Sequence, residues 1–95
     1  MGGKSAEGLE YRIETYDAGR AKLPEFARSQ PEFLREDAGT FDFAGRSAQV
    51  VFSMRIEDDH VYICQHVASR ESDALLGLIL RRMLAANDHV VLSEA

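Results

Sequence analysis

The sequence predicts a small α+β domain, in which a mainly antiparallel sheet of about five strands has helices packed on one face. Two alternating apolar runs flank the acidic cluster at residues 57–59, which is typical of a β-hairpin over residues 48–68. A long amphipathic segment, residues 69–87, follows the hairpin and predicts a helix. Shorter strand-like and helix-like runs precede the hairpin and one more strand follows the helix, so the expected order is β-α-β-β-β-α-β.

The length and composition fit one folded unit. Ninety-five residues are enough for one domain with a hydrophobic core, and 45% hydrophobic with 28% charged residues is an ordinary globular composition. Residues 1–8 contain three glycines and no large apolar side chain after Met1. We therefore expect residues 9–95 to form a single α+β domain and residues 1–8 to be a disordered lead or a remnant of cloning.

The charge and the cysteine content exclude several classes of protein. A net charge of -5 with no basic cluster disfavours nucleic-acid binding. The longest apolar run, residues 74–80, is too short to cross a bilayer, and the N-terminus has no apolar signal segment. A single cysteine, Cys64, excludes an internal disulfide. The sequence thus predicts a soluble, acidic, cytoplasmic protein with neither a nucleic-acid nor a membrane partner.

The segments before the hairpin alternate between strand and helix signals. Residues 9–16 place apolar and charged side chains on opposite faces, which predicts a half-buried strand. The sequence Pro-Glu-Phe then occurs at residues 24–26 and again at 31–33. Because proline suits the first turn of a helix, these copies predict two short helices or one helix kinked before Pro31. Residues 40–43 alternate again and predict a strand after Gly39.

The predicted hairpin has two unlike faces. With the loop at residues 57–60, the expected cross-strand pairs of the core face are Ile56 with Val61, Met54 with Ile63, Phe52 with Gln65, and Val50 with Val67. The opposite face carries Val51, Ser53, Arg55, Tyr62, Cys64 and His66. This mixture of apolar and polar side chains is unusual for a face that meets only water, so we expect function to lie there.

The predicted long helix has a broad apolar side. At about 100° per residue, its apolar stripe covers about half of the circumference. The stripe consists of Leu75, Leu76, Ile79, Leu80, Met83 and Leu84. Leu78 falls outside the stripe, and Gly77 costs roughly 1 kcal/mol relative to alanine in mid-helix. These two residues indicate close approach by another element or by a partner chain. Residues 89–92 predict the final strand.

Cys64 and His66 are the candidate catalytic residues. They lie two apart on a predicted strand, so their side chains point the same way. An imidazole can activate a thiol as a nucleophile, Arg55 would favour the thiolate, and Ser53 or Tyr62 could donate to an oxyanion. The competing interpretation, a buried cysteine beside a structural histidine, is the more common one in proteins, so enzymatic activity stays uncertain.

A metal site or a cofactor is not indicated. His60, His66 and His89 are far apart in the sequence, and residues 58–60 are expected to form a solvated turn at the hairpin tip. The sequence therefore predicts no metal and no cofactor.

The preferred prediction is a non-catalytic binding or interaction module. A short chain buries its apolar surface more completely by pairing, so we expect a homodimer that uses the outer face of the 48–68 hairpin. A small molecule or another protein is the further candidate ligand. The predicted binding residues are Ser53, Arg55, Tyr62, Cys64, His66 and Leu78. The alternative is a small enzyme that uses Cys64 with His66 as a nucleophile and base pair.

Overall fold

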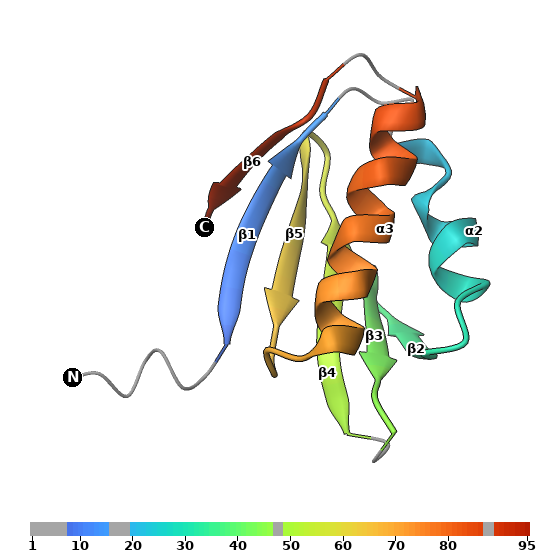
Figure 1. The fold of residues 1–95 in the computed structure, drawn as a ribbon. Coiled ribbons are helices and arrows are strands. Elements are labelled where there is room, and N and C mark those ends of the chain that lie inside the picture. The colour runs from blue at the N-terminus through green and yellow to red at the C-terminus, as the bar shows by residue number, and fades with distance from the viewer. Residues whose placement is uncertain (1–7, 16–19, 47–48, 87–88) are drawn as a thin grey trace.

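In the described part of the chain, six antiparallel strands form one sheet, and helices α2 and α3 lie on one of its faces (Figure 1). The computed structural model describes residues 8–15, 20–46, 49–86 and 89–95. The strands are β1 (Leu9–Glu14), β2 (Phe33–Asp37), β3 (Thr40–Ala44), β4 (Val50–Ile56), β5 (His60–Gln65) and β6 (Val91–Glu94), and the helices are α2 (Leu23–Arg28) and α3 (Arg70–Ala86). The strand order is β2-β3-β4-β5-β1-β6. The α+β prediction is confirmed, with one strand more than expected.

The parts of the prediction near the N-terminus fare differently. Residues 1–7 of the predicted lead lie outside the described residues, whereas Gly8 is described. Strand β1 alternates as expected, with Ile13 fully buried and Glu14 exposed.

Neither of the two helices named above is long and apolar enough to span a membrane.

The second Pro-Glu-Phe copy does not begin a helix. The first copy behaves as expected, because α2 begins at Leu23 and Pro24 lies in its first turn. After Pro31, however, the chain turns and enters strand β2 at Phe33. The ring of Phe33 packs against the rings of Phe41 and Phe43, with centroid distances of 6.5 and 6.2 Å. Burial of this ring against β3 is a tertiary interaction, and it outweighs the local helix signal.

A two-residue turn fixes the pairing of β2 with β3. Ala38 and Gly39 both have positive φ, at 51° and 83°. Positive φ at both central residues defines the tight turn whose twist matches that of a hairpin, and glycine adopts it without strain. This turn brings Asp37 opposite Thr40. The predicted second helix is therefore replaced by a strand at the edge of the sheet.

The predicted register of the central hairpin is right for three of its four pairs. Ile56 lies opposite Val61, Met54 opposite Ile63, and Phe52 opposite Gln65. The fourth pair does not form, because β5 ends at Gln65 and the N–H groups of His66 and Val67 both donate to the carbonyl of Val51, at 2.9 and 3.3 Å. On the other side of β4, a register shift against β3 places Val50 opposite Ala44 and skips Val51. The extra residue of such a bulge turns its side chain away from the alternating pattern. Val51 is consequently 6% exposed and lies in the core, so its expected place on the outer face is wrong.

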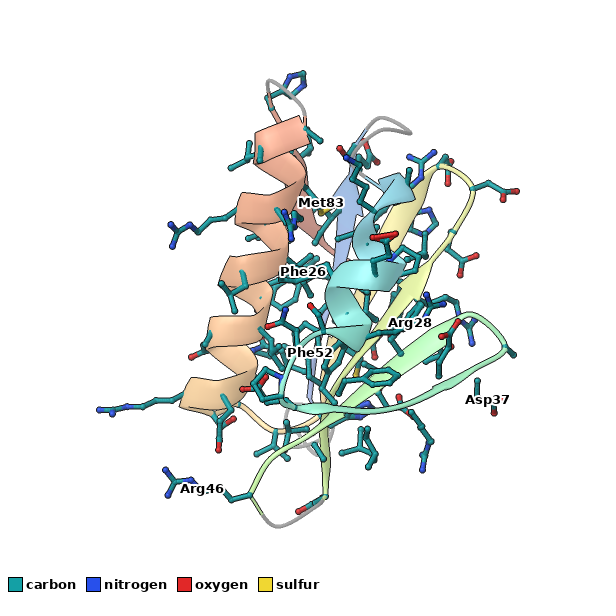
Figure 2. All side chains as sticks on the ribbon, turned by 90° about the vertical axis from the view of Figure 1, so that its right-hand side faces the viewer. Phe26, Arg28, Asp37, Arg46, Phe52 and Met83 are labelled. Atoms are coloured by element: carbon teal, nitrogen blue, oxygen red, sulfur yellow. The ribbon has the colours of Figure 1, made fainter. Side chains whose placement is uncertain are left out.

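Helix α3 covers the middle of the sheet with part of its apolar stripe. Leu75, Ile79 and Met83 are buried as expected, whereas Leu84 is 47% exposed. The guanidinium of Arg82 lies 5.0 Å from the ring centroid of Phe26, so this side of α3 faces α2 (Figure 2). Leu84 is on the opposite flank, at the margin of the covered area. The predicted stripe is therefore too broad by this residue.

A buried polar link joins the end of β5 to the start of α3. The amide of Gln65, which is 2% exposed, donates to Ser72 Oγ at 3.0 Å and to Asp73 Oδ1 at 2.9 Å. Ser72 Oγ donates in turn to the carbonyl of Val67 at 2.8 Å, and the N–H of Ser72 donates to Ser69 Oγ at 3.2 Å. Ser69 thus caps the helix, and both N–H donors of the Gln65 amide are paired.

We expect Ser72→Ala to lower the free energy of unfolding by about 1–3 kcal/mol. The substitution removes the hydroxyl that satisfies both the buried amide of Gln65 and the carbonyl of Val67. Urea denaturation followed by circular dichroism measures the change. An unaltered unfolding midpoint would contradict the role assigned to this link.

We expect Gly77→Ala to raise the free energy of unfolding by about 1 kcal/mol, because alanine is the better helix former. Among the described residues, nothing lies within 4 Å of a Cβ placed at Gly77, so no other element of the same chain requires glycine there. Gly8→Ala is the matched control with the opposite sign. Gly8 has a φ of +118°, and its Cβ would collide with the carbonyl oxygen of Gln65.

Candidate functional site

The face of the sheet opposite the helices carries most of the predicted site residues. Residues that lie opposite each other on antiparallel strands share a face, so the register aligns two rows of side chains across the sheet. One row consists of Asp42, Ser53, Cys64 and Glu10, and the other of Thr40, Arg55, Tyr62 and Arg12. We call this surface the outer sheet face.

The structure brings five of the six predicted binding residues together. Ser53 and Arg55 come from β4, Tyr62 and Cys64 from β5, and His66 follows the end of β5. Leu78 does not join them, because it lies on α3, on the other side of the sheet. Its side chain is exposed there, so its predicted contact with a partner remains a prediction about a different surface.

A chain of hydrogen bonds runs from Asp42 to Cys64. Ser53 Oγ lies 2.6 Å from Asp42 Oδ1 and 2.9 Å from His66 Nε2. His66 Nδ1 lies 3.7 Å from Cys64 Sγ. Arg35 closes the far end by donating from Nε to the other oxygen of Asp42 at 3.0 Å. The expected proximity of Cys64 and His66 is thus present, together with two partners on β3 and β4.

The direction of each hydrogen bond follows from the carboxylate. The carboxylate of Asp42 only accepts, so the hydroxyl of Ser53 donates to it and accepts from His66 Nε2–H. In a neutral imidazole this leaves Nδ1 as the acceptor for the thiol of Cys64. Each of these hydrogen bonds then has one donor and one acceptor when Cys64 is a thiol. The imidazole accepts from the thiol, as a general base would, and Asp42 and Ser53 orient the ring.

The electrostatic surroundings of Cys64 also favour the thiol. Burial raises the pKa of Cys64, and the negative charge of Glu10 raises it further, while a hydrogen bond from Tyr62 lowers it. A reactive cysteine needs the opposite setting, with cations or a helix N-terminus that lower the pKa. The charge on Arg55, expected to favour the thiolate, is not among the causes of this shift.

A shallow depression of about 360 Å³ lies on the outer sheet face, beside the hydrogen bonds that connect Asp42 with Cys64. It is lined by Thr40, Ser53, Arg55, Glu57, His60 and Tyr62. Three of these residues were predicted, whereas neither Cys64 nor His66 lines the depression. The concave part of the surface and the candidate nucleophile are therefore adjacent but separate.

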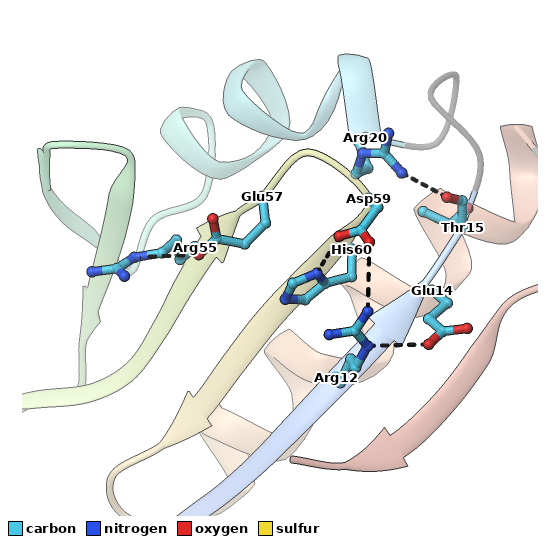
Figure 3. Close-up of polar contacts among 8 residues, drawn as sticks. All are labelled: Arg12, Glu14, Thr15, Arg20, Arg55, Glu57, Asp59 and His60. Atoms are coloured by element: carbon cyan, nitrogen blue, oxygen red, sulfur yellow. Dashed lines mark hydrogen bonds and ion pairs between the residues drawn. The ribbon is translucent and has the colours of Figure 1, made fainter.

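Arg55 and Tyr62 supply donors to the depression. Arg55 Nε donates to Thr40 Oγ1 at 3.2 Å and lies 3.8 Å from the carboxylate of Glu57 (Figure 3). Burial raises the pKa of Tyr62 to about 12, with further contributions from its hydrogen bond to Glu10 and from Cys64. The phenol is thus neutral at physiological pH and acts as a hydrogen-bond donor.

His60 is not part of the loop at the hairpin tip. The N–H of Glu57 donates to the carbonyl of His60 at 2.9 Å, so the turn is only two residues long and His60 is the first residue of β5. His60 Nδ1 lies 2.7 Å from Asp59 Oδ1, and Arg12 approaches the same carboxylate at 3.7 Å (Figure 3). The hydrogen bond to His60 and the charges of His60 and Arg12 lower the pKa of Asp59. The expected solvated turn is therefore anchored to β1.

Several residues of this surface could not be found from the sequence. Asp42 and Thr40 alternate with Phe41 and Phe43, which marks them as the polar side of their strand. Nothing local indicates that this strand lies beside the hairpin, and Glu10 comes from the N-terminal strand.

Among the described residues, no three His, Cys, Asp or Glu side chains are grouped so that they could hold a metal ion.

Comparison with known proteins adds no further identification. No protein-family model, no curated protein and no solved structure matches the chain.

Proposed function

We propose that the protein is a non-catalytic interaction module that binds a positively charged surface of a protein partner through its outer sheet face. The observation that supports this most directly is the charge of that face. Among the described residues, the register and the contacts place six carboxylates there, against the three guanidinium groups of Arg12, Arg35 and Arg55. The carboxylates are those of Glu10, Glu14, Asp37, Asp42, Glu57 and Asp59. This acidic excess attracts a basic partner and repels nucleic acid.

The polar side chains of this face are held in place before a partner arrives. Ser53, His66 and Asp42 are fixed by the hydrogen-bonded chain, and Arg55 is fixed by Thr40. Side chains that are already ordered lose less conformational entropy on binding. The face can therefore bind with little rearrangement.

The shape of the depression favours a protein partner over a small molecule. Small-molecule sites are mostly apolar and enclose most of their ligand. This depression is shallow, and five of its lining residues carry a hydroxyl, a charge or an imidazole in addition to Tyr62. Such a surface suits one projecting polar side chain, such as a lysine that reaches Glu57.

The acidic excess also bears on the predicted homodimer. Two outer sheet faces packed together would bring like charges into one interface, which costs free energy. We therefore assign the outer sheet face to a different protein of opposite charge.

We expect a blocked tetralysine peptide to shift the amide resonances of outward-facing residues of β3, β4 and β5, in an NMR titration of the 95-residue chain. The double variant Glu57→Gln/Asp59→Asn should bind the peptide about fivefold more weakly, because two attractive charges are lost. Added salt should weaken binding further.

Glu25→Gln is the matched control, since Glu25 is an exposed carboxylate on α2, on the helical side of the sheet. This variant should bind the peptide like the original chain. Equal shifts with blocked tetraglutamate, shifts spread over α2 and α3, or no shifts at saturating peptide would refute the proposal.

The thiol enzyme is the second candidate, and the 3.7 Å contact between Cys64 and His66 favours it. An enzyme of this kind would need a lowered thiol pKa. The two candidates thus differ in the expected ionisation of one side chain.

We expect the pKa of Cys64 to lie above the ordinary ~8.5. The rate of alkylation by iodoacetamide as a function of pH measures it, because Cys64 is the single cysteine. Glu10→Gln should lower this pKa, since the variant removes a nearby negative charge that disfavours the thiolate. A pKa below 7 in the original chain would instead support the enzyme.

A further inference from the structure

The helices leave one edge of the sheet uncovered. Six strands spaced by about 4.8 Å occupy about 29 Å, whereas two helices packed side by side cover about 20 Å. Helix α2 lies beside β2 and β3, where Arg28 bonds Glu36 and approaches the ring of Phe41. Figure 1 shows β1 and β6 extending beyond α3 on the opposite side. We call the helix-side surface of these two strands the β1–β6 wing.

The β1–β6 wing is mainly apolar. The alternation of β1 places Leu9 and Tyr11 on the same face as the buried Ile13. Leu92 lies opposite Ile13, so it shares that face. Leu9 and Leu92 are each 43% exposed, although a helix would normally cover such positions.

One flank of α3 continues this apolar surface. At about 100° per residue, Leu76, Leu80 and Leu84 lie on one side of α3, away from the Arg82 side that faces α2. Leu76 and Leu80 are half-buried against the core, and Leu84 is exposed. These three leucines therefore lie beside the exposed apolar surface of the β1–β6 wing. An apolar surface of this extent marks an interaction site more often than isolated exposed leucines do.

We propose that a second copy of this chain covers the surface, with α3 of each copy lying on the β1–β6 wing of the other. A two-fold axis roughly parallel to α3 produces this arrangement. It places the two leucine flanks against each other and one sheet on each side of the helix pair. The surface is self-complementary, because each copy supplies the helix that the other lacks.

The charges of the β1–β6 wing and of the outward surface of α3 are opposite in sign, as this dimer requires. Glu94 lies opposite Tyr11, on the helix side of the wing, and its carboxylate is the one charge that the described part of β1 and β6 places there. The arc of α3 that points away from its own sheet contains Arg70 and Arg81. An acidic wing therefore meets a basic helix surface across the two-fold axis.

Gly77 fits the same arrangement. It lies between Arg70 and Arg81 on the outward arc of α3. With no atom of the described residues within 4 Å of a Cβ there, the backbone of α3 is open to a partner. The absence of a side chain lets the helix approach the wing closely, as at other helix contacts with small residues.

Sedimentation velocity of the full 95-residue chain over a range of concentrations tests the proposal, and we expect a monomer–dimer equilibrium. Leu84→Glu should weaken the dimer at least tenfold, because it places a charge in the apolar contact. Leu34→Glu is the matched control, because Leu34 is an exposed leucine of β2 at the opposite edge of the sheet, and it should leave the dimer unchanged. Both side chains are exposed in the single chain, so both variants should fold, as circular dichroism can verify.

Further variants at Arg81, Glu94 and Gly77 locate the contact. Arg81→Glu and Glu94→Arg should each weaken the dimer, and the double variant should regain most of the lost affinity. Gly77→Arg should weaken it by blocking close approach, whereas Gly77→Ala should have much less effect.

A strict monomer at several hundred micromolar would overturn the proposal. So would equal effects of Leu84→Glu and Leu34→Glu, or a double charge exchange that restores nothing. None of these results bears on binding of a basic peptide to the outer sheet face, so the two proposals are tested independently.

Discussion

The width of the sheet is the constraint on which the rest of the structure depends. Each strand adds about 4.8 Å, and a helix covers about two strands. Once residues 33–37 form β2, the sheet is wider than α2 and α3 can cover. Because α2 packs near β2 and β3, the strands that neither helix covers are β1 and β6. The exposure of Leu84, Leu9 and Leu92 has this single geometric cause.

The position of α3 is fixed by polar contacts as well as by its apolar stripe. Gln65 would be an unfavourable residue for the core face if it lacked partners. Its hydrogen bonds to Ser72 and Asp73 instead hold the first turn of α3 over the end of β5. From that point, the contact of Arg82 with Phe26 sets which flank of α3 faces α2. The helix is thereby held beside α2 and away from the wing.

Features that depend on neighbours in the sequence could be predicted, and those that depend on neighbours in space could not. The alternation of β4 and β5 correctly separated Met54 and Ile63 from Arg55 and Tyr62, because side-chain direction is a local property. The burial of Val51 arises from a bulge against β3, which the sequence of β4 alone does not reveal. For the same reason, Asp42 could not be assigned to the site before β3 was known to lie beside β4.

The candidate site divides in the same way. The proximity of Cys64 and His66 was predicted from their spacing, and it is present although His66 lies just after the end of β5. The ionisation of Cys64 depends on its burial and on Glu10, which belongs to a strand more than 50 residues earlier in the chain. Sequence spacing can therefore suggest a nucleophile, but the direction of its pKa shift depends on the neighbouring strand.

The two proposed surfaces have consequences for each other. In the proposed dimer, α3 of each copy lies between the two sheets, so the outer sheet faces point in opposite directions, away from the dimer interface. Their acidic excess then stays exposed and far apart, so like charges do not oppose pairing. A basic partner with two suitable sites could engage both faces at once, and the second contact would then form at a high effective concentration. Under the two proposals, weak binding by one face is compatible with strong binding by the pair, and dimerisation would have a functional role beyond burying leucines.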